Sequence, residues 1–195
     1  MGTIVLSGPQ NITLDGVVQD PDGKEGWGLG GWFVEHGGAD LRPWGQIALE
    51  EANGASAWLL GRRSYEFFFQ RWEPRATELA DRLRAIPKYV VSSTLVDPAW
   101  SNTTVLGGDA VASVAQLKDE IEGEIVIPAS HRLGRTLMAH GLVDEVRLVV
   151  FPVVLGAGER FFGDGVGSEP MRLTNTRPIG SGLVMLTYRW TRAGR

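Results

Sequence analysis

The feature that most restricts the fold of this chain is a regular alternation of strand-like and helix-like segments between residues 56 and 154. Short runs of β-branched and other apolar residues predict strands at residues 56–60, 88–92, 103–106, 124–127 and 145–154. Between them, apolar residues recur at helical spacing and predict helices at residues 64–71, 77–84, 111–121 and 132–140. Strands and helices that alternate in this way predict a mostly parallel sheet with helices packed on it.

The two ends of the chain add further strands to this pattern. Residues 3–6 and 11–14 are strand-like on either side of Ser7-Gly-Pro-Gln, and residues 42–53 predict a helix. Near the C-terminus, strands at residues 172–176 and 183–191 flank a hairpin signal at residues 178–182. We therefore expect one α/β domain over residues 1–195, in three layers, with a mixed, mostly parallel sheet and a C-terminal antiparallel hairpin.

A glycine-rich segment at residues 19–38 interrupts the pattern and contains Trp27 and Trp32. Such a segment is usually a lid over a ligand or a disordered insert. Trp32 and the adjacent Phe33 can stack on a flat heterocyclic substrate, although aromatic side chains more often pack in a core. Both roles stay open at this point.

Composition and motif content exclude several classes of function. The formal net charge of −4 argues against nucleic-acid and membrane-surface binding, which need a basic surface. With no cysteine, the chain has no disulfide, thiolate nucleophile or cysteine-ligated metal. His36, His131 and His140 lack metal-ligand spacing, so we expect no metal site. The chain also has no Gly-x-Ser-x-Gly, Walker A or strand-linked Gly-x-Gly-x-x-Gly motif, which disfavours hydrolase, P-loop and Rossmann chemistry.

The chain shows no targeting or membrane-spanning segment. Its N-terminus lacks the basic and apolar regions of a signal peptide, and no apolar run is long enough to span a membrane. We therefore expect a soluble, cytoplasmic protein.

Three of the predicted strands end in residues suited to binding phosphate. These are Gly61, Arg62, Arg63 and Ser64 after the first strand, Ser92, Ser93 and Thr94 after the second, and Ala129, Ser130 and His131 after the third. Guanidinium groups bind phosphate in a bidentate manner, and a helix start offers free backbone N–H groups. Each segment also has an ordinary alternative: exposed arginines, a polar turn and an N-cap formed by Ser130. Because the carboxyl ends of parallel strands meet at one edge of a sheet, the three together predict one anion-binding crevice.

Four sequence blocks, taken in order, resemble one known family. They are ITLDG at residues 12–16, LLGRRSYE at 59–66, IPKYVVSSTL at 86–95 and GLVDEVRLVVFPVVLGAGERFF at 141–162. The GLVDE turn before a long strand that ends in PVVLGAG is similar to that of dihydrofolate-reductase-like proteins of the RibD C-terminal, riboflavin reductase type. The blocks are spread from residue 12 to residue 162, so the resemblance covers nearly the whole chain.

The resemblance implies a dihydrofolate-reductase-like fold with a sheet of about eight strands. It further implies hydride transfer from NADPH to a small nitrogen heterocycle, as in 5-amino-6-(5-phosphoribosylamino)uracil reductase of riboflavin biosynthesis or in dihydrofolate reductase. A homodimer of the family type is also expected, built partly from the exposed sheet edge and its hairpin.

The resemblance assigns roles to the residues at the three strand ends. The segment 61–64 contacts cofactor phosphate, 92–94 lies near the adenosine 2′-phosphate, and 129–131 lies at the pyrophosphate. NADPH is expected over NADH because the additional phosphate favours additional positive charge. Asp15 lies in the block that faces the substrate, where it can orient or protonate a ring nitrogen as a catalytic residue. As the first half of an Asp-Gly pair, it is equally a common turn former.

Two positions depart from the family pattern. Around the pyrophosphate serine the family usually has glycines, whereas this chain has Pro128-Ala-Ser-His131, although His131 can itself donate to phosphate. After the LDG turn, where riboflavin-pathway reductases typically have a lysine, Val17 and Val18 follow. A non-catalytic nucleotide- or ligand-binding protein with an altered cofactor loop is therefore the rival hypothesis.

Overall fold

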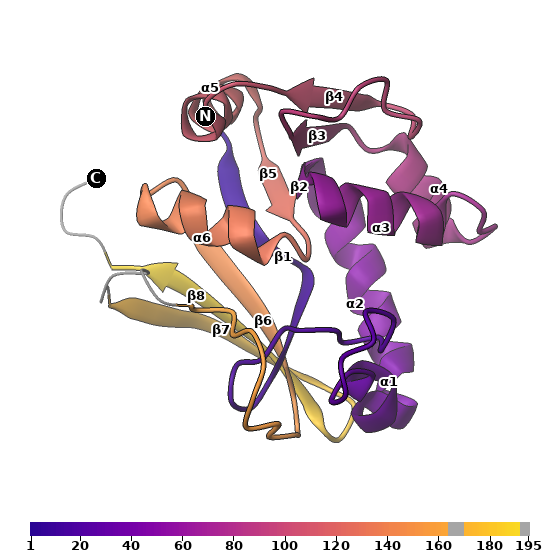
Figure 1. Ribbon diagram of the computed structural model, residues 1–195. Helices are drawn as coiled ribbons and strands as arrows, with labels where there is room; N and C mark the ends of the chain where they lie inside the picture. The colour runs from indigo at the N-terminus through magenta and orange to yellow at the C-terminus, as the bar shows by residue number, and fades with distance from the viewer. Residues whose placement is uncertain (164–169, 192–195) are drawn as a thin grey trace.

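The computed structural model describes residues 1–163 and 170–191, and its strands form one eight-stranded sheet (Figure 1). The strands are β1 (Thr3–Thr13), β2 (Ala55–Gly61), β3 (Lys88–Val91), β4 (Thr103–Leu106), β5 (Glu124–Ile127), β6 (Glu145–Phe151), β7 (Met171–Ile179) and β8 (Leu183–Trp190). Their order is β4-β3-β2-β5-β1-β6-β8-β7. All pairs from β4 to β6 in this order are parallel, whereas β8 is antiparallel to both β6 and β7. The predicted mixed, mostly parallel sheet with a C-terminal antiparallel hairpin is confirmed.

Helices cover both faces of this sheet. They are α1 (Trp32–Gly37), α2 (Leu41–Gly54), α3 (Arg62–Trp72), α4 (Glu78–Ala85), α5 (Ala110–Glu120) and α6 (His131–Ala139), and a 3-10 turn, η1 (Gly38–Asp40), joins α1 to α2. Figure 1 shows α5 and α6 on one side of the sheet and α1 to α4 on the other. Among the described residues, no helix is both long and apolar enough to cross a membrane.

The alternation of side chains along the central strands fills both helix–sheet interfaces. Leu59 and Ile125 pack in one core cluster with residues of α5 and α6. Their neighbours Trp58, Leu60 and Val126 pack in a second cluster with residues of α2, α3 and α4. Because successive side chains of a strand point to opposite faces, a strand covered on both sides must be apolar at nearly every position.

Strand β1 is interrupted by a bulge in its pairing with β6. Residues Thr3 to Leu6 pair with β5, and β1 pairs with β6 both at Val5 and Leu6 and from Gln10 to Thr13, with a register shift between Leu6 and Gln10. The two strand pieces predicted around Ser7-Gly-Pro-Gln are therefore one strand with a bulge. The bulge lies next to the loop that follows β5, because a Cβ on Gly8 would stand 2.7 Å from Cβ of Pro128.

The glycine-rich segment at residues 19–38 contains more structure than the sequence predicted. Asp20 is 2% exposed, and its carboxylate accepts hydrogen bonds from the backbone N–H groups of Glu25 and Trp27, both at 3.0 Å. The second half of the segment forms α1, which the loop prediction missed. A six-residue helix is too short to show a helical repeat. It is held by Trp32, which packs edge-on against Phe151 in the core.

Candidate functional site

The three predicted phosphate-binding segments meet at one place, which we call the strand-end site: residues 61–64, 92–94 and 129–131. Strands β3, β2 and β5 are neighbours and run parallel, so their carboxyl ends share one edge of the sheet. The backbone N–H of Gly61 donates to Oγ of Ser130 at 3.0 Å, which joins the ends of β2 and β5. The guanidinium of Arg62 donates from Nη1 to Oγ1 of Thr94 at 2.6 Å, which joins the ends of β2 and β3.

The two arginines of the site differ in how they are held. Nε of Arg62 lies 2.8 Å from a carboxylate oxygen of Glu66, one helical turn further along α3, so the side chain is fixed by Glu66 and Thr94 together. It is nevertheless 46% exposed, so part of the guanidinium stays accessible. Arg63 is 75% exposed, and its Nη2 lies 3.7 Å from Glu25 in the glycine-rich segment.

Both helices that begin at the strand-end site lack a side-chain cap. At the start of α3, the N-cap position is Gly61, which has no side chain to offer. At the start of α6, Ser130 occupies the predicted N-cap position, but its hydroxyl accepts from Gly61 and caps nothing. Helices α4 and α5, by contrast, are capped by Thr77 and Asp109. In α6 the N–H of His131 already donates to the carbonyl of Ala129. The first N–H groups of α3, and those that follow His131 in the first turn of α6, have no side-chain acceptor, and such groups favour anions.

The two serines of the second segment differ: Ser92 is hydrogen-bonded within its turn, and Ser93 is exposed. Oγ of Ser92 accepts hydrogen bonds from the backbone N–H groups of Thr94 and Leu95, so it forms the polar turn that was the ordinary alternative. Ser93 is exposed. Ser64, in the first turn of α3, is half-buried.

Ala129 adopts a backbone conformation that glycine normally takes. Its φ is 51°, in the left-handed region, at the position where the resemblance described above implies a glycine. The two residues beside it close this turn: the N–H of Ser130 donates to the carbonyl of Pro128 and that of His131 to the carbonyl of Ala129. The loop thus keeps the glycine-like shape while carrying a Cβ.

Asp15 lies away from the strand-end site, and its carboxylate accepts hydrogen bonds from neighbouring residues. Leu6 is the last residue of β1 that pairs with β5. The seven residues from there to Thr13 span on the order of 20 Å, and Asp15 lies just beyond Thr13. Its carboxylate accepts from Oγ1 of Thr13 at 2.6 Å and from the backbone N–H of Gly156 at 2.9 Å. Burial alone would raise the pKa of Asp15, but these hydrogen bonds lower it. These hydrogen bonds are those of the turn-forming alternative, and a catalytic role for Asp15 stays a prediction.

The aromatic residues of the glycine-rich segment pack within the protein. Trp32 is 1% exposed and its indole N–H donates to the carbonyl of Gln19, so the prediction that it stacks on a substrate is wrong. Phe33 is half-buried and lies edge-on to Trp44, with ring centroids 4.8 Å apart. Trp27 covers Gly158, because any side chain at that glycine would collide with its ring.

The sequence analysis missed the residues that surround His131. The ring of His131 lies 3.2 Å from Oε2 of Glu159, and Arg132 and Arg135 contact the same carboxylate. Burial alone would raise the pKa of Glu159, but hydrogen bonds from Arg135 and His131 lower it to about 2. No local pattern links position 131 with position 159, and only the fold brings them together.

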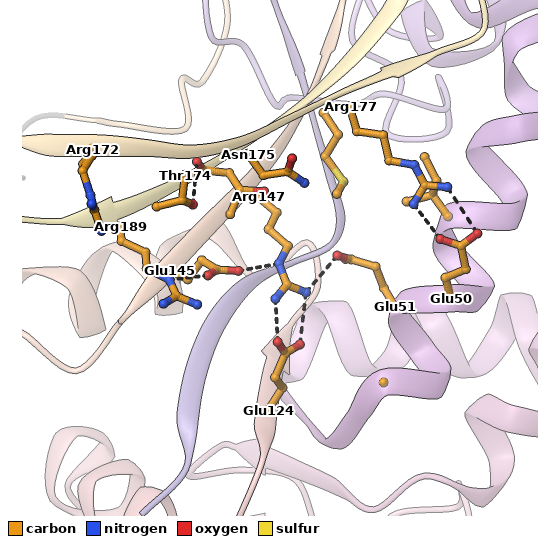
Figure 2. A pocket seen from close by; sticks show the side chains of 14 residues that line it. Glu50, Glu51, Glu124, Glu145, Arg147, Arg172, Thr174, Asn175, Arg177 and Arg189 are labelled. Atoms are coloured by element: carbon orange, nitrogen blue, oxygen red, sulfur yellow. Dashed lines mark hydrogen bonds and ion pairs between the residues drawn. The ribbon is translucent and has the colours of Figure 1, made fainter.

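A pocket of about 640 Å³ lies at the opposite end of the parallel strands (Figure 2). It lies between α2 and strands β6 to β8, and its floor is an ion-pair cluster centred on Arg147. This guanidinium contacts Glu51, Glu124 and Glu145 at 2.6 to 3.0 Å. Glu51 in turn accepts from Ser7 and from the N–H of Gly8 at 3.0 Å, so the cluster also supports the β1 bulge. Each of the three carboxylates is paired with Arg147, and Glu145 also contacts Arg189 at 2.7 Å, which indicates a structural role.

Within residues 1–163 and 170–191, no group of three or more His, Cys, Asp or Glu side chains is placed to hold a metal ion.

Comparisons with known proteins agree with this fold. The RibD C-terminal domain family model matches residues 10–185. The chain is 28% identical over 185 residues to the uncharacterised protein YyaP of Bacillus subtilis, covering 92% of this chain and 91% of that protein. Its structure is similar to a "putative riboflavin biosynthesis protein" from Shewanella sp. PV-4, with a TM-score of 0.73, 20% identity, and 98% and 100% of the two chains covered. It is also similar to dihydrofolate reductase from Enterococcus faecalis complexed with NADP(H), with a TM-score of 0.60, 16% identity, and 98% and 97% covered.

The match to the family spans most of the chain, and the solved structures share its sheet and helices. The four sequence blocks that suggested the resemblance fall on the strand-end site and on β1 and β6. This chain belongs to the RibD C-terminal domain family and has the dihydrofolate-reductase-like fold.

Proposed function

We propose that this protein is an oxidoreductase that binds NADPH at the strand-end site and transfers hydride to a small planar nitrogen heterocycle. The observation that carries the proposal is the meeting of the three predicted phosphate-binding segments through the Gly61–Ser130 and Arg62–Thr94 hydrogen bonds. Membership of a family with reductase-like relatives supports the reaction class, and the NADP(H) bound by the Enterococcus faecalis reductase supports the cofactor class.

The residues at the site fit a phosphorylated dinucleotide. We assign the adenosine 2′-phosphate to Arg62 and Ser93, because both are exposed at the ends of β2 and β3. We assign the diphosphate to the uncapped starts of α3 and α6, beside Ser130. When bound, NADPH supplies the hydride, and the chain's residues bind and orient it.

Titration with NADPH, followed by nicotinamide fluorescence, tests this proposal. The parent protein should bind saturably, and Arg62→Ala should weaken binding about tenfold, because a charge-assisted contact to phosphate is lost. Arg75→Ala is the matched control, since Arg75 lies beyond the other end of α3 and stacks on Trp72. No saturable change with the parent protein would refute the cofactor assignment.

The proposed substrate class, a pyrimidine- or pteridine-like ring, is supported by the family alone. Val17 and Val18 are 0% and 6% exposed, so the stretch after the LDG turn offers a substrate no cationic side chain where riboflavin-pathway reductases have one. We therefore propose a planar heterocycle without assigning a step of riboflavin biosynthesis. A panel of such rings, assayed by the loss of NADPH absorbance, tests the class, and 5-amino-6-(5-phosphoribosylamino)uracil belongs in it.

A second candidate function, ligand binding without catalysis, is favoured by the loop at Ala129. This loop carries a Cβ in a left-handed conformation, and Pro128 beside it has no N–H to donate. The double variant Ala129→Gly/His131→Gly separates the two functions. Tight NADPH binding in the double variant but not in the parent would favour the rival, and oxidation of NADPH by the parent with a heterocyclic substrate would exclude it.

We also propose that the protein forms a homodimer through β7. This strand is the last of the sheet, and its residues from Arg172 to Pro178 are all exposed. An edge strand with unpaired backbone groups is a place where a second chain can add.

A further inference from the structure

A single carboxylate, that of Glu159, contacts three basic side chains of α6. Oε2 of Glu159 lies 3.2 Å from Nε2 of His131, and Oε1 lies 3.5 Å from Nε of Arg132. Oε1 also accepts a hydrogen bond from Nη2 of Arg135. All three partners belong to α6, whereas Glu159 comes from the loop after β6.

The position of Glu159 is fixed independently of these contacts. Its carbonyl accepts from the N–H of Val18 at 2.8 Å, and its own N–H donates to Oε1 of Gln19 at 3.0 Å. Beside it, Arg135 donates to the carbonyl of Arg160 at 3.1 Å. The carboxylate is therefore presented to α6 by a loop that the rest of the fold holds in place.

This ion cluster adjoins the strand-end site. His131 directly follows Ser130, whose hydroxyl binds the N–H of Gly61 at 3.0 Å. Cationic side chains around a helix start attract phosphate, and guanidinium groups do so most strongly. In this chain those cations already have an anion, and the carboxylate is only 28% exposed.

We propose that Glu159 is an internal competitor that occupies the cations of α6 in place of the cofactor's diphosphate and so weakens cofactor binding. This inference rests on the proposed function. It also gives the Pro128-Ala-Ser-His131 departure a reason: His131 replaces the usual small residue because it holds the competing carboxylate. The cofactor gains Arg132, Arg135 and His131 only by displacing Glu159.

The substitution Glu159→Gln tests the competition, because it removes the charge and keeps the shape. NADPH should bind Glu159→Gln about tenfold more tightly than the parent, since a nearby negative charge is lost and two guanidinium groups are released together with His131. The affinity of the variant should also fall more steeply as salt is added. Glu122→Gln is the matched control: Glu122 is exposed, at the other end of β5 from Ser130, and should leave the affinity unchanged. Equal or weaker binding by Glu159→Gln would overturn the inference.

Inorganic pyrophosphate separates this inference from the proposed function. If neither protein binds NADPH, the proposed function fails, and calorimetric titration with pyrophosphate then decides on Glu159 alone. Tighter pyrophosphate binding by Glu159→Gln than by the parent supports the competition, and equal or absent binding refutes it. Far-UV circular dichroism checks that the variant is folded. Should it fold poorly, Glu159→Asp withdraws the charge by one methylene, and its pyrophosphate affinity should exceed that of the parent by a smaller factor.

Discussion

At the scale of single residues, Ala129 and Glu159 distinguish the loop after β5 from an ordinary helix start. Ala129 holds a φ of 51°, which costs a non-glycine residue about 1 kcal/mol or more. Such conformations persist only where the surroundings enforce them, and here two backbone hydrogen bonds and the contact between Pro128 and the β1 bulge do so.

Replacing Ala129 by glycine should therefore stabilise the protein. We expect a gain of about 1 kcal/mol in the free energy of unfolding, measured by urea denaturation, because the left-handed conformation no longer meets a Cβ. The same change at Ala112, an exposed residue in α5, should destabilise by about 0.5–1 kcal/mol. Destabilisation at both positions would show that Ala129 is not strained.

Glu159 should make stability fall at acid pH. Its pKa is about 2 in the folded protein against an ordinary value of 4.5, so its ion pairs stabilise the fold fully above pH 4.5. That stability is lost as the pH falls from 4.5 to about 2. The difference in unfolding free energy between the parent and Glu159→Gln should shrink over this window. A difference that stays constant with pH would contradict the ion-pair assignment.

At the scale of elements, a buried lysine, Lys88, donates hydrogen bonds to backbone carbonyls at the C-terminal end of α4. Nζ of Lys88 donates to the carbonyls of Leu83 at 2.7 Å, Arg84 at 3.2 Å and Ile86 at 2.8 Å. The side chain is 0% exposed and lies 4.6 Å from the ring centroid of Trp100. Burial lowers the pKa of Lys88 to about 8, which still leaves the group mostly charged at neutral pH. The last carbonyls of α4 thus find a donor on the first residue of β3.

Lys88→Met should destabilise the protein by about 2 kcal/mol, because the variant keeps the volume but removes the donor to the carbonyls of Leu83 and Ile86. The carbonyl of Arg84 keeps Ser101 and Asn102 as donors. Thermal and urea unfolding measure the loss. Lys24→Met is the control: this side chain is 67% exposed and should change stability by less than about 0.5 kcal/mol. An effect at Lys88 no larger than that at Lys24 would show that the three hydrogen bonds contribute nothing net.

The elements also show how far sequence patterns reach. Strands β4 and β5 begin and end where predicted, because short β-branched runs between turn residues are strong local signals. Helix α1 was missed because glycines surround it and its stability comes from Trp32 in the core. The hairpin turn was placed too early, since Pro178 lies within β7, where an edge strand tolerates proline.

At the scale of the whole molecule, one part of the strand-end site could be predicted from the sequence and another part could not. Arg62 and Ser130 could be placed together in advance, because parallel topology brings the carboxyl ends of neighbouring strands to one edge. The role of Glu159 could not, since nothing local relates it to His131. Trp32 was misassigned for a related reason. An aromatic side chain beside glycines gives the same sequence pattern whether it faces a ligand or the core, and here it lies in the core.

The proposed dimer can be tested through the exposed edge. Leu173 is 48% exposed on β7, so Leu173→Lys should convert a dimer to a monomer by placing a charge in the interface. Light scattering coupled to gel filtration gives the mass. Val96→Lys, at a residue that is 77% exposed elsewhere, should leave the mass unchanged. A monomeric parent protein would refute the dimer.

The central position of β1 in the sheet affects how the chain folds during synthesis. Its partners on both sides, β5 and β6, are synthesised long after it, and Ile4 donates to Asp144 across 140 positions. Ile4, Val5 and Leu6 are 0% exposed in the finished sheet, yet on the ribosome they have no strand to pair with until most of the chain has emerged. Long-range parallel pairing is slow and leaves apolar segments uncovered. In the nascent chain, β1 is therefore the segment that a chaperone has most reason to protect.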